Sequence, residues 1–165
     1  MASRAERRPF IDFSRLLPAE YAGFVAAAIL FVSLFLPWFS TAGQNAQING
    51  EQGTFNAFET FGEAVPFLPL DYLLAAACIA PFVLAYIIVR GHALSWRPGE
   101  VTAIVGIIAF VLVLCNGVIL GKPGNPPEEI EFGIGYPIAL VGAVGIIITG
   151  FVRQAQNVGR KPPGV

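Results

Sequence analysis

Four uninterrupted apolar runs constrain this chain more than any other feature of its sequence. They cover residues 21–39, 68–89, 101–120 and 134–152. Each has about the 20 residues that an α-helix needs to cross the hydrocarbon core of a bilayer. Because that core offers no water to the backbone, each run must pair its own peptide groups as a helix. The sequence therefore predicts an all-α membrane protein, a four-transmembrane-helix bundle.

The composition agrees with a membrane protein and is too apolar for a soluble domain of this length. Hydrophobic residues make up 55% of the chain and charged residues only 13%. Both cysteines fall inside apolar runs, and the chain has a single histidine. Sequence motifs of nucleotide-binding, metalloprotease or serine hydrolase type are missing from the chain. We therefore expect no enzymatic activity, no catalytic residue, no cofactor, no metal and no nucleic-acid partner.

The basic residues are distributed unevenly between the two ends of the predicted bundle. Four precede the first run, two separate the second from the third and three follow the fourth, so nine of the ten face one compartment. Lys122 alone faces the other. The positive-inside rule then predicts a multi-pass cell-membrane protein with both termini cytoplasmic. The predicted plan is a cytoplasmic segment 1–19, a transmembrane domain 20–152 with outer loops 40–67 and 121–133, and a cytoplasmic tail 153–165.

The first outer loop is the one segment outside the membrane with enough residues for structure of its own. An Asn-Gly pair near its middle suits a short β-hairpin. Further on, Asn56 followed three residues later by Glu59 matches a capping box, which favours a short helix. Phe58 and Phe61 then share one face of that helix. We expect an interfacial helix that lies on the outer membrane surface or caps the bundle; an aromatic pocket that grips a ligand is the alternative.

Aromatic residues near the ends of the apolar runs are typical of membrane interfaces. Trp38 and Phe39 follow a proline at the outer end of the first run, and Trp96 lies next to Arg97 between the second and third runs. Tryptophan is enriched where hydrocarbon meets headgroups, because its ring is apolar and its N–H is polar. We predict that Trp38, Phe39 and Trp96 are interfacial anchors.

The fourth apolar run is rich in glycine and carries small residues along one helical face. Small side chains let helices approach closely within a membrane. The predicted helix-packing strip consists of Ala139, Gly142, Ala143, Ile146 and Thr149. We expect the strip to pack inside the bundle, with contact between two copies of the chain as the alternative.

Asn116 is the one strongly polar side chain well inside an apolar run. An amide without a partner is costly in hydrocarbon, so Asn116 should face the bundle interior and bond to a neighbouring helix. Its depth favours Ser33 and Tyr136 as partners over the carbonyls loosened by Pro81. In a channel, the same amide would line a polar path.

Three short motifs resemble a group of small bacterial four-span membrane proteins of unknown function. The motifs are Leu36-Pro37-Trp38-Phe39, Asn56-Ala57-Phe58-Glu59-Thr60-Phe61 and Asp71-Tyr72-Leu73-Leu74-Ala75. In that group a Pro-Trp-aromatic end of the first span precedes an Asn-Ala-aromatic-x-x-Phe segment and an aspartate that opens the second span. The order of a long and a short outer loop is also similar to claudins, but the paired cysteines of the claudin loop are missing. The resemblance implies a protein of the bacterial inner membrane and no particular activity.

Short loops, a small-residue packing face and the lack of a reactive constellation favour a protein that acts by contact. We predict an accessory, assembly or scaffold subunit whose partners are the lipid bilayer and either another membrane protein or a second copy of the chain. The alternative is a small channel or transporter component, in which Asn116 and the acidic outer loops form a polar path. No ionisable residue lies near the centre of an apolar run, which disfavours proton-coupled transport.

Overall fold

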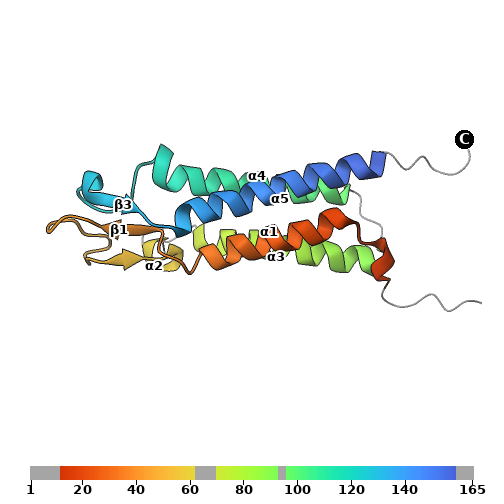
Figure 1. Ribbon diagram of the computed structural model, residues 1–165, viewed down its shortest axis with the longest axis horizontal. Helices are drawn as coiled ribbons and strands as arrows, with labels where there is room; N and C mark the ends of the chain where they lie inside the picture. Colours follow the sequence, from red (N-terminus) through yellow and green to blue (C-terminus); the bar gives the residue numbers. More distant parts are fainter. Residues whose placement is uncertain (1–11, 62–69, 93–95, 159–165) are drawn as a thin grey trace, which may run out of the picture.

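The computed structural model of the chain describes residues 12–61, 70–92 and 96–158. Four helices of the described residues lie side by side, and short strands form a head at one end of them (Figure 1). The helices are α1 (Pro18–Ser33), α3 (Leu70–Val89), α4 (Pro98–Leu114) and α5 (Gly135–Val158). The start of α1 and the end of α5 both lie at the end away from the head (Figure 1).

Three of the described helices are long and apolar enough to cross a membrane, judged by length and composition. They are Leu70–Val89, Pro98–Ile119 and Gly135–Gln156, whereas α1 is a shorter apolar helix. Their outward faces carry large apolar side chains, and Ile108 and Val141 are 53% and 64% exposed. An apolar exterior around a packed interior indicates that a lipid bilayer surrounds these helices.

α1 ends at Ser33, short of the predicted end at residue 39, because of Pro37. The residue before a proline is pushed out of the helical region, and proline has no N–H to continue the ladder. The indole Nε1 of Trp38 turns back and donates a hydrogen bond of 2.7 Å to the backbone carbonyl of Ser33. The same carbonyl also accepts from the backbone N–H of Leu36 at 3.2 Å, so both bonds satisfy a group that the end of the helix leaves without an α-helical partner.

The head is a three-stranded antiparallel sheet in the order β2-β1-β3. The strands are β1 (Phe39–Thr41), β2 (Thr54–Phe55) and β3 (Ile130–Phe132). β1 pairs with β2 of its own loop on one side and with β3 of the second outer loop on the other. The two outer loops therefore form one body, and the predicted all-α fold lacked this sheet. Strands of two or three residues are too short to give an alternating pattern in the sequence.

The turn predicted at the Asn-Gly pair is present in the first outer loop. Ile48 and Glu51 exchange two backbone hydrogen bonds of 2.9 and 3.0 Å around it. Asn49 and Gly50 have φ angles of 52° and 83°. A positive φ at both central residues is the mark of a type I′ hairpin turn, for which Asn-Gly is the preferred pair.

The short helix α2 (Ala57–Phe61) follows β2. The backbone N–H of Asn56 donates to the carboxylate of Glu59 at 2.9 Å, and the N–H of Glu59 donates to Asn56 Oδ1 at 3.0 Å. These two reciprocal bonds are the predicted capping box. The backbone N–H of Ala57 also donates to the carbonyl of Leu34 at 3.1 Å, so the start of α2 is tied to the end of α1.

α5 packs closely along both α1 and α4. A Cβ atom added at Gly142 would lie 2.7 Å from the backbone nitrogen of Leu30 in α1. One added at Gly150 would lie 2.5 Å from the backbone nitrogen of Ala103 in α4. Backbones that approach this closely leave no room for side chains, which is how small residues tighten helix contacts in membranes.

α5 and α4 both differ from the predicted runs at the end away from the head. α5 continues to Val158, so residues 153–158, which belong to the predicted cytoplasmic tail, are helical. α4 begins at Pro98, where proline suits the first helical position. These extensions carry polar residues into the bundle, and an apolar run cannot reveal them.

Candidate functional site

A cleft of about 420 Å³ opens on the head between the Asn-Gly turn, β2 and α2. Its lining residues are Asn49, Glu51, Gln52, Thr54, Phe55, Phe58 and Glu59. Phe55 is buried and Phe58 half-buried, whereas the polar side chains of the lining are mostly exposed. A concave surface that combines aromatic area with a few polar groups is the usual form of a binding site.

The walls of this cleft are fixed to each other and to the bundle. Asn49 Nδ2 donates hydrogen bonds to the carbonyls of Glu59 at 2.9 Å and Thr60 at 3.4 Å, which ties the turn to α2. The ring of Phe58 lies 5.2 Å, between centroids, from the ring of Phe35 at the end of α1. The cleft is therefore held in place by the helix bundle, and its shape is largely formed before anything binds.

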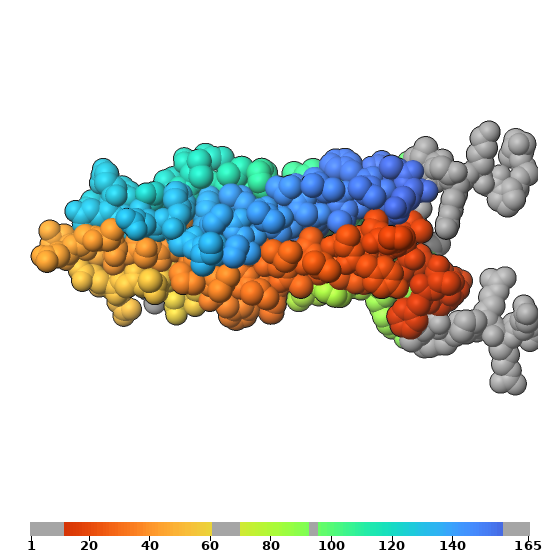
Figure 2. All heavy atoms as spheres, viewed as in Figure 1, coloured from red at the N-terminus to blue at the C-terminus, as the bar shows by residue number. Residues whose placement is uncertain are grey.

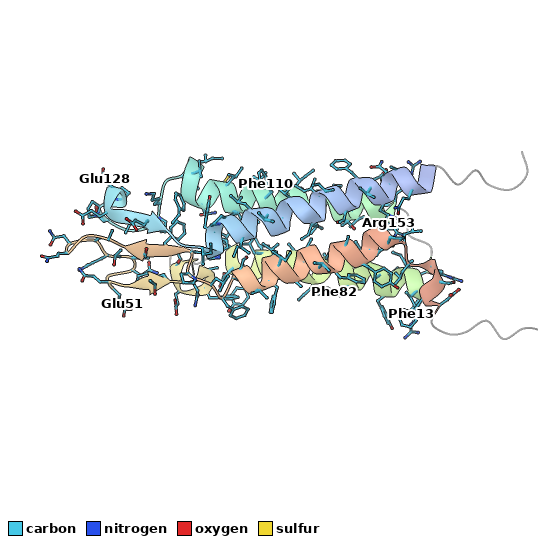
Figure 3. All side chains as sticks on the ribbon, in the orientation of Figure 1. Phe13, Glu51, Phe82, Phe110, Glu128 and Arg153 are labelled. Carbon is cyan, nitrogen blue, oxygen red and sulfur yellow. The ribbon has the colours of Figure 1, made fainter. Side chains whose placement is uncertain are left out.

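The described part of the head is acidic. Its ionisable residues are Glu51, Glu59, Lys122, Glu128, Glu129 and Glu131. Lys122 donates a 2.5 Å hydrogen bond to the carbonyl of Ile130 and lies 5.2 Å from the ring centre of Phe132. Because Lys122 is occupied by β3, the acids dominate the surface. Glu51 and Glu128 lie on opposite sides of the head (Figure 3).

Trp38 and Phe39 lie beneath the head and are fully buried, so the prediction that they anchor the protein at the lipid interface is wrong. Their rings pack against the ring of Tyr136, with centroids 5.7 Å away in both cases. The early end of α1 turns the chain into β1 and carries both aromatic residues inward. Trp96, by contrast, is 63% exposed, and its position suits the predicted interfacial anchor.

Among the residues that the structure describes, Asn116 forms no hydrogen bond to a neighbouring helix, and the prediction of such a bond to Ser33 or Tyr136 is wrong. Its Nδ2 donates to the carbonyl of Leu112 in its own helix at 3.0 Å. At Asn116 and Gly117 the backbone leaves the helical conformation, within a π-helical turn (Cys115–Ile119). Tyr136, one of the predicted partners, instead donates its hydroxyl to the carbonyl of Val113 at 3.0 Å. The amide of Asn116 therefore finds its partner in its own helix, one turn before the distorted backbone.

The predicted helix-packing strip of α5 lies inside the bundle. Ala139, Ala143 and Ile146 are fully buried, and Gly142 meets the backbone of α1. The hydroxyl of Thr149 donates to the carbonyl of Ile146 at 2.9 Å. Of the predicted outer-loop helix residues, Asn56 and Glu59 form the cap, Phe58 lines the cleft, and the side chain of Phe61 lies outside what the structure describes.

A buried ion pair between Glu20 of α1 and Arg153 of α5 was not predicted from the sequence. Each side chain is only 8% exposed. The pair borders an internal cavity of about 20 Å³ that also touches Pro81 of α3 and Thr102 of α4. That volume suits a single water molecule. The sequence feature that could have indicated this ion pair is an acidic residue in the first helix and a basic residue in the last, at about the same depth in the bundle.

The cleft offers hydrogen-bonding groups, carboxylates and aromatic surface, which suit the binding of a partner or ligand. Among residues 12–61, 70–92 and 96–158, no group of three or more His, Cys, Asp or Glu side chains could hold a metal ion. No protein-family model, curated protein or solved structure matches this chain. Its function is therefore inferred from the geometry.

Proposed function

We propose that this chain is a non-enzymatic, four-span protein of the bacterial inner membrane that serves as an accessory or scaffold subunit. Its head would present the acidic cleft to a partner on the outer side. The observation that carries this proposal is the joining of both outer loops in one sheet that rests on the helix bundle. A head fixed in this way holds a docking surface at a defined height and angle above the membrane.

The charge distribution supports an outer position for the head. Arg15, Arg90, Arg97 and Arg153 all belong to the end of the bundle away from the head, and Lys122 belongs to the head. Cytoplasmic segments of membrane proteins are enriched in arginine and lysine. In this arrangement α1 also spans the membrane, beside α3, α4 and α5, and the turns at residues 34–36 lengthen it. Both termini are then cytoplasmic.

The lining of the cleft suggests the chemistry of the partner. Glu51 and Glu59 supply negative charge, and Gln52 and Thr54 supply hydrogen-bonding groups beside the buried ring of Phe55. A basic segment of another membrane or envelope protein complements this surface. Charge complementarity of this kind increases the rate of association and weakens with salt.

The packed interior disfavours the alternative of a channel. The cavity beside Glu20 and Arg153 has room for about one water molecule. The negative charge of Glu20 and the positive charge of Arg153 neutralise each other. The amide of Asn116 is occupied by the carbonyl of Leu112. Within the described residues, these groups do not line a continuous polar path, so we propose no transport function.

A pull-down from native membranes in mild detergent tests the proposal, with Glu51→Lys as the cleft variant and Glu128→Lys as the control. Both positions are exposed on the head, and only Glu51 lines the cleft. We expect partner proteins to co-purify with the wild type and the control and to be lost with Glu51→Lys. A homo-oligomer without partners that conducts ions in liposomes would contradict the proposal and favour a channel.

A further inference from the structure

An apolar surface begins where α4 and α5 meet the head and extends onto the head itself. Its residues, which we call the apolar flank, are Val118, Ile119, Leu120, Phe132 and Ile134. Their exposed fractions lie between 43% for Phe132 and 76% for Leu120. Exposed apolar side chains that gather on one surface mark a contact with another molecule or with a membrane.

The two parts of the apolar flank, after α4 and in β3, are joined by Tyr136. Its hydroxyl donates to the carbonyl of Val113 in α4 at 3.0 Å. Its ring is so close to Gly117 that a Cβ atom there would lie 2.7 Å from it. On its other side, the ring centroid of Phe132 is 4.6 Å away. The apolar flank is therefore one fixed surface, because a single buried ring holds both parts in place.

The apolar flank continues the lipid-facing sides of α4 and α5. Ile134, Val141 and Ile148 follow each other at intervals of about two helical turns, and all three are exposed. Val111 of α4 is likewise exposed, two turns before Val118. No charged residue occurs in the segments 101–120 and 132–152. The surface that lipid covers on the helices thus passes onto the head without a polar boundary.

The edge of the sheet beside the apolar flank is suited to contact with lipid. β3 is an edge strand, and the Ile130 carbonyl of this strand accepts a hydrogen bond from Lys122 Nζ. The backbone N–H of Leu120 donates to the carbonyl of Cys115 at 2.9 Å. Backbone groups that meet hydrocarbon must be paired, because lipid chains offer them no partner.

The length of the helix before the apolar flank sets its depth. The helical segment Pro98–Ile119 has 22 residues, or about 33 Å at 1.5 Å per residue. The hydrocarbon core of a bilayer is about 30 Å thick. With the exposed Trp96 at one membrane interface, Ile119 and Leu120 reach the other. Lys122 follows at the level where lysine keeps its amine among headgroups and its stem along apolar surface.

We propose that the apolar flank is inserted into the membrane leaflet next to the head, so that the β3 edge of the head rests among the upper acyl chains. The cleft adjoins β2, at the opposite edge of the sheet. Insertion on one side would fix the tilt of the head and leave the β2 edge in water. The apolar flank would also supply the anchor at this interface that the buried Trp38 and Phe39 do not provide. The inference goes beyond the proposed scaffold function and does not depend on which compartment the head faces.

Spin labels on single cysteines test this proposal, in full-length chain without Cys78 and Cys115 in vesicles of phosphatidylethanolamine and phosphatidylglycerol. Molecular oxygen concentrates in hydrocarbon and a nickel chelate stays in water, so the ratio of their collision rates reports whether a label meets lipid. We expect this ratio at Leu120→Cys and Ile134→Cys to lie several-fold above that at Asn45→Cys, which is exposed on the head. It should approach the ratio at Ile108→Cys, an exposed position within α4.

Thr54→Cys is the matched control, since Thr54 is exposed on β2 at the opposite edge of the sheet. Its ratio should equal that of Asn45→Cys. Ratios at Leu120 and Ile134 as low as that of Asn45 would overturn the proposal. So would low collision rates with both reagents at these two positions, because protein rather than lipid would then cover the apolar flank. A lipid-like ratio at Thr54 would contradict insertion on one side only.

Discussion

Phe39 and Phe132 face each other across the β1–β3 pair, with ring centroids 5.6 Å apart. One belongs to the first outer loop and the other to the second. Their strands also bring the two loops together along the length of the head, which merges with the bundle into one elongated body (Figure 2). Loops that pair in this way cannot move independently, and so the cleft keeps its position over the bundle.

The indole hydrogen bond at the end of α1 should contribute measurably to stability. Trp38→Phe removes the bond from Nε1 to Ser33 and leaves most of the buried ring area in place. A net loss of about 1 kcal/mol in unfolding free energy is expected. Thermal or denaturant unfolding in detergent measures it. Trp96→Phe, at an exposed position, should change stability by much less, and equal losses would argue against a buried Trp38.

The Glu20–Arg153 pair should be strongly coupled, because each charge is buried against the other. Glu20→Leu leaves Arg153 without its partner, and a loss of about 3–5 kcal/mol is expected. The double variant Glu20→Leu/Arg153→Leu should recover most of that loss, since it removes both charges. A double-mutant cycle in unfolding experiments gives the coupling energy. Additive effects of the two single changes would mean that the charges do not meet.

Close contact between α1 and α5 depends on Gly142. A Cβ atom there would lie 2.7 Å from the backbone of Leu30, so Gly142→Ala must push the helices apart. We expect a loss of about 1–3 kcal/mol, typical of overpacking. Unfolding of Val141→Ala, at the next residue and 64% exposed, provides the control. If Gly142→Ala were as stable as the wild type, the helix-packing strip of α5 would not form the close contact with α1.

The orientation of the bundle can be measured by labelling single cysteines in intact cells, in a background without Cys78 and Cys115. Asn45→Cys, exposed on the head, should react with a membrane-impermeant maleimide from outside. Trp96→Cys, exposed at the opposite end, should react only after the membrane is permeabilised. Labelling of Trp96→Cys in intact cells would reverse the orientation.

Features of this fold that depend on neighbouring residues were accessible from the sequence. Helical segments follow from apolar length, the type I′ turn follows from Asn49-Gly50, and the capping box follows from Asn56 and Glu59. In each case the residues that determine the structure lie within a few positions of each other. Backbone geometry and local hydrogen bonding then decide the outcome.

Features that depend on distant residues were not accessible. The strands β1 and β3 are only three residues each and come from separate loops. Glu20 and Arg153 lie near opposite ends of the chain and meet only when α1 packs against α5. The burial of Trp38 depends on the direction in which the chain leaves α1. A tryptophan at the end of an apolar run has the same hydropathy pattern around it whether its side chain faces lipid or is buried in the protein core. Hydropathy therefore cannot distinguish the two.

The central claim is that the two outer loops form one head on the outer side of the membrane. Ser40 and Glu131 are directly paired across β1 and β3, and the spacing of such pairs suits a disulfide. In a variant of the chain without Cys78 and Cys115, Ser40→Cys/Glu131→Cys should oxidise spontaneously in cells, because the compartment proposed for the head is oxidising. Ser40→Cys/Glu128→Cys is the unpaired control. A disulfide in the first variant alone, seen by thiol labelling before and after reduction, is the predicted result; free thiols in both would contradict the account.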